Sequence, residues 1–186
     1  MLIFGVALFY AVIAVTSPWA FHIGGRFTPL LYWHGSGKLV TKDGVEYPMY
    51  VLLSPRKSSR SYGGRRDGLR STGNLGGSAA LCTAPGVIQR LRLSGTVYGA
   101  WSTADGGLVA FRLLETKYLD VGRQQGFFDL SGRWRGPELA LDHPGEQGNV
   151  FRSGLRIEGA TATLDWGSYS DFEAACARAT NLPAEK

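Results

Sequence analysis

The sequence is poor in the residue types from which enzymes most often build active sites. It has two cysteines and three histidines, and it contains no CxxC, no HExxH and no two histidines four residues apart. The GxSxG turn of hydrolases is also absent. The segment HGSGK at 34–38 differs from a phosphate-binding loop, because Tyr32 replaces the first glycine and Leu39 follows the lysine. We therefore expect no metal, no cofactor and no enzyme activity.

Charge is missing from the N-terminus, where Arg26 is the first Asp, Glu, Lys or Arg. The apolar run 2–15 has a length between those of a spanning helix, roughly 20 residues, and of a typical signal-peptide apolar region, and the absence of a preceding Lys or Arg and of a good cleavage site favours an uncleaved anchor. Pro18 predicts that a helix ends near residue 16, and Trp19 suits a membrane interface. Residues 1–23 are therefore predicted to be a hydrophobic anchor helix or a cleaved signal segment. The remaining alternative is a buried core helix.

Residues 24–186 are enough for one domain. The 26 glycines follow no G-x-y repeat and separate short apolar runs, which is typical of a β-rich fold with many turns. The residues Leu91, Leu93, Val97 and Trp101 alternate with polar ones, as in a strand with one buried face. We predict a mainly β fold, a single antiparallel β-sandwich or small barrel of about seven or eight strands.

Two local patterns refine this fold. Asp43-Gly44 between apolar runs predicts a hairpin turn, and Pro48 predicts that the following strand begins late or lies at an edge. Near the C-terminus, Ser170 and Glu173 have the spacing of a capping box, which predicts a short helix stopped by Asn181 and Pro183. Its apolar face would hold Phe172, Cys176 and Ala179.

The two cysteines, Cys82 and Cys176, follow an export-like segment, which favours a disulfide between them. It would close a loop of about 94 residues, worth about 4–5 kcal/mol in the chain-entropy model. The alternative is two buried free thiols.

The net charge of the chain is concentrated in one segment. The chain carries +5, from 20 Lys and Arg against 15 Asp and Glu, and residues 56–70 hold six basic residues and one acid. The rest of the chain therefore balances at 14 against 14. This segment lies in a predicted loop at 55–80, which is either a solvated loop or a site that contacts an anionic surface. Its basic residues are Arg56, Lys57, Arg60, Arg65, Arg66 and Arg70.

The segment LSGRW at 130–134 resembles the Gly-x-Trp motif of the lipocalin and avidin barrels, where it opens the barrel. The resemblance implies an eight-stranded cup for a small apolar ligand. A third reading is an unrecognised hydrolase, which would need His34 or His143 beside two acids.

The reading we prefer is a non-enzymatic interaction or assembly module, anchored to a membrane or exported. The segment at 56–70 would contact anionic lipid or an envelope polyanion, a protein partner is a further alternative for the module, and an export segment argues against nucleic acid as a ligand. The cysteines favour an extracytoplasmic domain, while Arg26 and Lys38 after the apolar run favour the opposite orientation.

Overall fold

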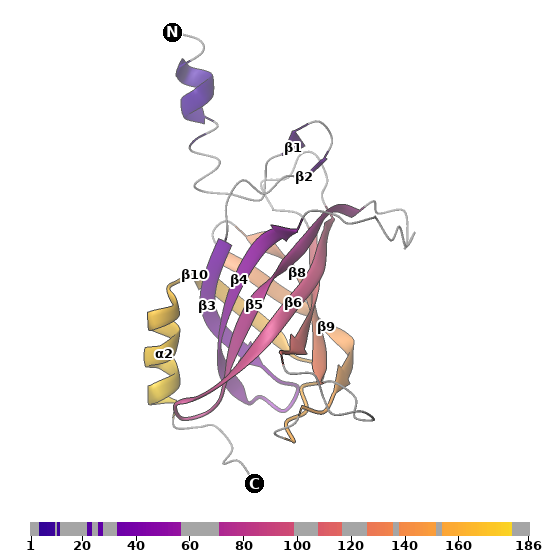
Figure 1. Cartoon of the computed structure of the whole chain (residues 1–186), viewed down its shortest axis with the longest axis vertical. Helices are drawn as coiled ribbons and strands as arrows, with labels where there is room; N and C mark the ends of the chain where they lie inside the picture. The colour runs from indigo at the N-terminus through magenta and orange to yellow at the C-terminus, as the bar shows by residue number, and fades with distance from the viewer. Residues whose placement is uncertain are drawn as a thin grey trace.

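The computed structural model of the chain describes residues 4–9, 11, 22–23, 26–27, 33–56, 71–98, 108–116, 126–135, 138–151 and 154–179. Eight strands form a closed antiparallel barrel in which each strand pairs with its neighbours in sequence, and the last strand pairs with the first. The strands are β3 Trp33–Val40, β4 Glu46–Arg56, β5 Ser71–Ala84, β6 Val87–Tyr98, β7 Leu108–Glu115, β8 Phe127–Arg135, β9 Glu138–Asn149 and β10 Thr161–Trp166. The barrel alternative and the count of eight are confirmed (Figure 1).

Alternation along the strands fills the inside of the barrel with apolar side chains. Each strand turns every second residue inward, as the period of two predicted for β6 requires. Each of the eight strands contributes a side chain that is at most 1% exposed: Leu39, Met49, Leu81, Leu91, Leu113, Leu130, Leu141 and Leu164. These residues belong to one continuous core, joined by Phe151 and Ile157 from the segment between β9 and β10.

The hairpin from β3 to β4 turns where the sequence predicts it. Lys42 and Asp43 form the turn, and Gly44 has φ +78°, a conformation that favours glycine. The expectation that Pro48 delays the second strand is wrong, because β4 begins at Glu46 and Pro48 pairs with Lys38. Pairing of β4 with β5 begins only at Met49, so Pro48 has a neighbouring strand on one side and its missing N–H is tolerated.

The predicted loop at 55–80 is wrong at both ends. β4 continues to Arg56, and residues 71–80 belong to β5, which pairs with β4 on one side and β6 on the other. Gly77 has φ +153°, and a side chain there would overlap the carbonyl oxygen of Leu52. The small residues of segment 71–80 have a low intrinsic preference for strands. Hydrogen bonds to β4 on one edge and to β6 on the other hold this segment in a strand.

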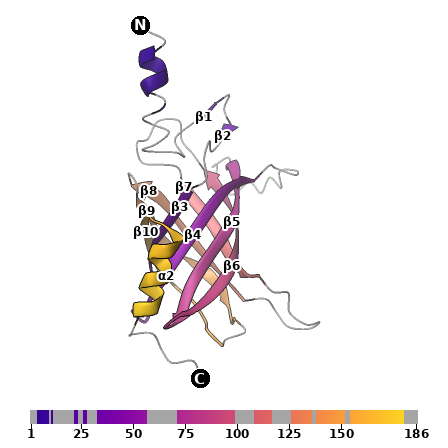
Figure 2. The same ribbon diagram turned by 60° about the vertical axis from the view of Figure 1, so that its left-hand side comes forward.

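A short helix, α2 Tyr169–Arg178, follows the last strand and lies along the outer wall of the barrel (Figure 2). The predicted capping box is misplaced by two residues, because the box pairs Ser168 with Asp171. The predicted apolar face is confirmed: Phe172 and Cys176 are at most 1% exposed, and Ala179 packs beside them. On the wall they meet a second apolar cluster formed by Tyr50, Ala80, Cys82 and Ile88. Burial raises the pKa of Tyr50, and the neighbouring Tyr169 adds to the shift.

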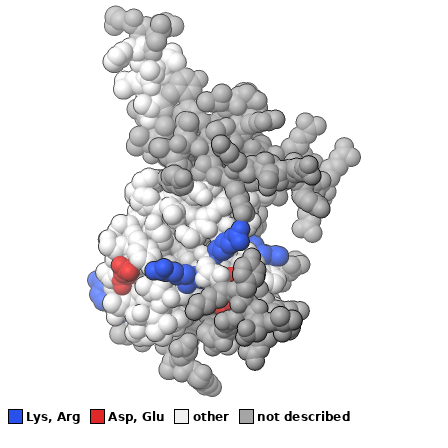
Figure 3. All heavy atoms as spheres, in the orientation of Figure 1, with Lys and Arg blue, Asp and Glu red and all other residues white. Residues whose placement is uncertain are grey.

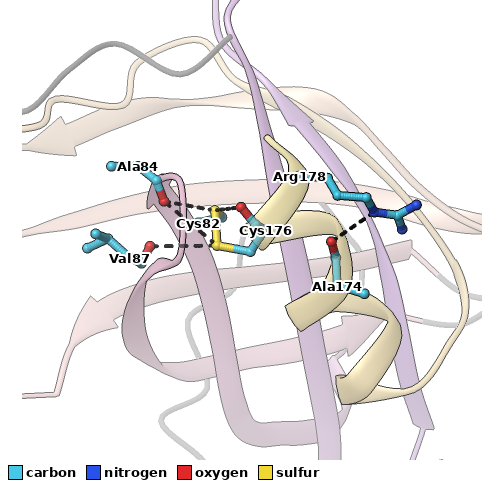
Figure 4. The surroundings of a disulfide bond; sticks show 6 residues. All are labelled: Cys82, Ala84, Val87, Ala174, Cys176 and Arg178. Atoms are coloured by element: carbon cyan, nitrogen blue, oxygen red, sulfur yellow. Dashed lines mark hydrogen bonds between the residues drawn. A yellow bond between two sulfur atoms is a disulfide. The ribbon is translucent and has the colours of Figure 1, made fainter. Parts of the chain in front are cut away.

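The helix is tied to the barrel by the predicted disulfide, which is confirmed. Cys82 on β5 and Cys176 on α2 are bonded, with Cα atoms 5.5 Å apart (Figure 4). The N–H of Gly86, in the turn between β5 and β6, donates to the carbonyl oxygen of Cys176 over 3.2 Å. The last turn of α2 is thus held both covalently and by the backbone.

The N-terminal part includes a helical stretch at residues 4–9 and a two-stranded hairpin of β1 His22–Ile23 and β2 Arg26–Phe27. β1 begins inside the predicted segment 1–23, so the hairpin crosses the predicted boundary with 24–186. Within the described part of the chain, no helix has the length and apolar character needed to cross a bilayer.

The first testable consequence concerns the disulfide. A helix of 10 residues is too short to be stable by itself, and Phe172 and Cys176 are the residues that α2 buries. In the variant Cys82→Ala/Cys176→Ala we expect amide protection to be lost in α2 and kept in β5, with unfolding free energy lower by about 4–5 kcal/mol. Hydrogen exchange and denaturant titration measure both effects. The variant Phe172→Leu, which keeps the disulfide, should keep α2 protected; undiminished protection of α2 without the disulfide contradicts the expectation.

The second consequence concerns acid. The Ser168 hydroxyl and backbone N–H both donate to the Asp171 carboxylate, which lowers the pKa of Asp171 from its ordinary value of 3.8. Because the folded pKa is the lower one, this stabilisation is complete above the ordinary value and is lost as pH falls through the folded value. We expect protection factors of the first-turn amides of α2 to drop below about pH 4. The Asp171→Asn variant should lose this dependence, and Glu173→Gln should retain it.

Candidate functional site

The candidate site is the end of the barrel nearest the N-terminal segment, here called the N-terminal rim and defined by Trp33, Arg56, Ser71, Tyr98 and Trp166. Trp33 begins β3 and Arg56 ends β4, and the two strands are antiparallel, with Trp33 paired to Leu53. Ser71, at the start of β5, pairs with Tyr98 at the end of β6. The chain therefore comes in from its N-terminal segment at the rim where the basic segment leaves and returns. Hairpin strand β2 contacts β5 and lies beyond this rim in both views (Figures 1 and 2).

Of the six predicted binding residues, the structure places Arg56. It is the last residue of β4, and its backbone pairs with Asn74 of β5. The other five lie outside the described residues: Lys57, Arg60, Arg65, Arg66 and Arg70. What the fold fixes is the base of the basic segment, because Arg56 and Ser71 end and begin adjacent strands at the N-terminal rim.

Two tryptophans at the N-terminal rim have opposite environments. Trp33 is 1% exposed and belongs to the inner core, with its ring against Gly35. Gly35 is the residue that pairs with Trp166, and Trp166 is 55% exposed. Alternation would turn Trp166 inward with Ala162 and Leu164, yet the space at Gly35 is taken by Trp33. The indole of Trp166 therefore remains at the surface.

The exposed indole rests on a fixed support. The ring of His34 lies beside that of Trp166, with centroids 4.6 Å apart and planes at 49°. Nδ1 of His34 is 2.7 Å from the carbonyl oxygen of Gly167, and since a carbonyl only accepts, Nδ1 carries the proton. A side chain at Gly167 would overlap the hydroxyl of Ser36, so the backbone after Trp166 is packed directly on β3.

A separate polar cluster lies on the outer wall, over β7 and β8. Arg112 and Asp129 are opposite each other in register and form a two-point ion pair, Nε–Oδ1 2.7 Å and Nη2–Oδ2 2.9 Å. The guanidinium also lies 4.3 Å from the ring centre of Phe127. The hydrogen bond to Asp129 raises the pKa of Arg112, which therefore stays charged. A shallow hollow of about 270 Å³ beside the pair is lined by Ser94, Ala110 and Ser131 among others.

At the opposite end of the barrel, Glu115 is 6% exposed and is the buried charged side chain among the described residues. Its carboxylate accepts from Nε2 of Gln89 over 3.2 Å and from the backbone N–H of Gly126 over 3.1 Å. The backbone N–H of Glu115 donates to the carbonyl oxygen of Gly126 over 3.0 Å. These bonds close the base of the connection between β7 and β8, which is a structural role.

The described residues do not form the site of a hydrolase, of a metal ion or of a ligand cup, which are the other kinds of site considered from the sequence. His34 contacts a carbonyl oxygen and an indole ring, and the side chain of His143 lies outside the described residues, so a hydrolase stays a prediction. No group of His, Cys, Asp and Glu side chains within the described ranges has metal-site geometry. Gly132 and Trp134 lie on β8, the sixth barrel strand, and the barrel interior holds packed side chains, which gives a ligand cup no support.

Sequence reasoning missed the features that depend on cross-strand register. Arg112 and Asp129 are 17 residues apart and meet only because β7 and β8 pair in one register. By the alternation along β10, Trp166 should face the barrel interior, where it would lie over Gly35. Nothing in the sequence around Trp166 indicates that the ring of Trp33 fills the space at Gly35.

Comparisons of the chain with protein-family models, with curated proteins and with solved structures found no match. The fold and the geometry of the described residues are therefore the basis on which a function is proposed.

The ion pair on the outer wall gives a stability prediction. Its side chains are 42% and 26% exposed, so we expect a coupling free energy of about 0.5–1 kcal/mol between Arg112→Met and Asp129→Asn in a double-mutant cycle. The matched control is Arg156 and Glu158, which are 59% and 52% exposed and should couple by about 0.2 kcal/mol or less. Equal coupling in the two cycles would mean that the two-point geometry adds nothing.

Proposed function

We propose that this chain is a non-enzymatic β-barrel module, held at a membrane by its N-terminal segment or exported, that contacts an anionic membrane or envelope surface through the basic segment 56–70. The barrel serves as a rigid support, and the contact is electrostatic. Arg56 and Ser71, which flank residues 57–70, both lie at the N-terminal rim, and this is the observation that carries the proposal.

Strand direction supports the proposal in a simple way. The apolar run 2–15 precedes Trp33, and Arg56 and Ser71 mark the base of the basic segment at the same rim. A membrane that holds the apolar run is therefore nearer to the basic segment than to the opposite end of the barrel. Each Lys or Arg near an anionic bilayer adds about 1 kcal/mol, and the effect decays within a Debye length of about 8 Å. Proximity is what such a contact needs.

The distribution of charge supports a local contact over a general one. Outside residues 56–70 the chain has equal numbers of basic and acidic residues. On the face drawn in Figure 3, most of the described wall is uncharged, and Asp and Glu side chains lie near its few Lys and Arg side chains. Such a wall offers little to a nucleic acid, which needs many phosphate contacts. The disulfide supports an extracytoplasmic location, since structural disulfides persist in oxidising compartments.

The proposal predicts how the full chain partitions between vesicles. The ratio of partition into anionic over zwitterionic vesicles isolates the charge contribution, because insertion of apolar residues is common to both lipids. Replacing Arg60, Arg65, Arg66 and Arg70 by Ser should lower this ratio by about two to three orders of magnitude at low salt. Salt should lower the wild-type ratio in the same direction.

A matched control removes equal charge elsewhere. The exposed residues Arg90, Arg92, Arg156 and Arg178 lie on the wall, on the segment after β9 and on α2, and their replacement by Ser changes the net charge by the same amount. This control should keep most of the wild-type partition ratio. Thermal stability should be unchanged in the variant that replaces Arg60, Arg65, Arg66 and Arg70. If both variants lower the ratio equally, the basic segment has no special part in binding.

A further inference from the structure

We infer that Trp166 is an interfacial anchor of the N-terminal rim, which inserts its indole at the headgroup level of an anionic lipid bilayer. This rests on the proposed function and narrows it, because it names a bilayer, rather than a dissolved polyanion, as the anionic surface. Lipid and polyanion share negative charge, but only the bilayer offers a region that takes up an indole ring.

The first step in the argument is the exposure of the side chain. Trp166 is 55% exposed, while the other barrel tryptophan whose side chain is described, Trp33, is 1% exposed. Leaving much of an indole in water forgoes a large hydrophobic gain, since a buried aromatic removes about 150–250 Å² from water. Burial on a partner surface recovers it. Tryptophan suits the bilayer interface because the ring is apolar and its N–H still finds a hydrogen-bond acceptor.

The second step is position. Trp166 ends β10 and pairs with Gly35 of β3, two residues from the start of the barrel at Trp33. The apolar run 2–15 lies upstream of that start, and the basic segment leaves from the same rim at Arg56. An indole at this place lies on the side of the barrel that the proposed anchor would hold toward the membrane. Val87 and Val150, also exposed, lie at the opposite end of the strands.

The third step is that the indole is held in place. It lies against the ring of His34, which is fixed through Nδ1 to the carbonyl oxygen of Gly167. Little side-chain freedom then remains to be lost on insertion, which favours binding. Asp165 is exposed just before it and carries a charge of the wrong sign. The contact of Trp166 is therefore apolar and resists salt, unlike the contact of the basic segment.

The test uses the full chain in vesicles of phosphatidylglycerol and brominated phosphatidylcholine, whose bromine quenches tryptophan inside the bilayer. The emission of Trp166 is the difference between wild type and Trp166→Phe, so the other four tryptophans cancel. We expect brominated lipid to lower this difference emission about twofold or more, at low and at high salt. The control difference, wild type minus Trp33→Phe, reports a ring inside the barrel and should not be quenched.

An unquenched Trp166 emission overturns the inference. If vesicle binding still depends on the basic segment in that case, the proposed function stands and only the anchor is wrong. Polyphosphate added instead of vesicles separates the two anionic partners: a change in Trp166 emission with polyphosphate and none with vesicles overturns the bilayer as the partner. Quenching that persists in the Arg60, Arg65, Arg66 and Arg70 to Ser variant supports the anchor, and the partition ratio of that variant between anionic and zwitterionic vesicles tests the charge contact separately.

Discussion

Strand β10 closes the barrel, and the other features of the fold depend on that closure. All six of its residues pair with β3, while only Ala162, Thr163 and Leu164 pair with β9. Each barrel strand therefore has a paired neighbour on both sides, and chain reversals alternate between two rims. An even number of strands then brings the end of β10 back to the rim where β3 begins. The meeting of Trp33, Trp166 and the base of the basic segment is thus a result of topology.

Closure also explains why the molecule has two apolar clusters. The inner core is shut off by the strands, so residues that face outward on β4, β5 and β6 need separate cover. Helix α2 supplies it over Tyr50, Ala80 and Ile88, and the disulfide joins the helix to the wall between these residues. The helix is short and buries only Phe172 and Cys176. The disulfide therefore supplies the stabilisation that a longer helix would gain from packing. The barrel itself does not need the helix in order to close.

Sequence reasoning reached what local patterns determine. The alternation around Leu91, the Asp43-Gly44 turn and the apolar face of α2 each follow from a few neighbouring residues, and each is confirmed. The sequence-based predictions were wrong where the neighbouring strands determine the structure. The glycines of β5 are held in a strand by pairing with β4 and β6. Pro48 is tolerated inside β4 because the pairing of β4 with β5 begins only at Met49. The candidate site depends on such partners too. The ends of β4 and β5 flank the basic segment, but which strands border them follows only from closure.

Covalent geometry links the charge contact to the aromatic one. Residues 57–70 leave and return at adjacent strands, so their midpoint lies at most seven residues from the rim, about 24 Å when fully extended. Screening limits the useful range beyond that to about 8 Å. Between the apolar run and the β1–β2 hairpin, whose strand β2 contacts β5, the chain has residues 16–21, which span up to about 20 Å by the same measure. The tether therefore keeps the rim within the reach of the basic segment, but it does not fix which side of the rim faces the membrane. A second, short-range contact at the rim removes that freedom, and among the side chains that the structure describes Trp166 is the exposed apolar one placed to make it.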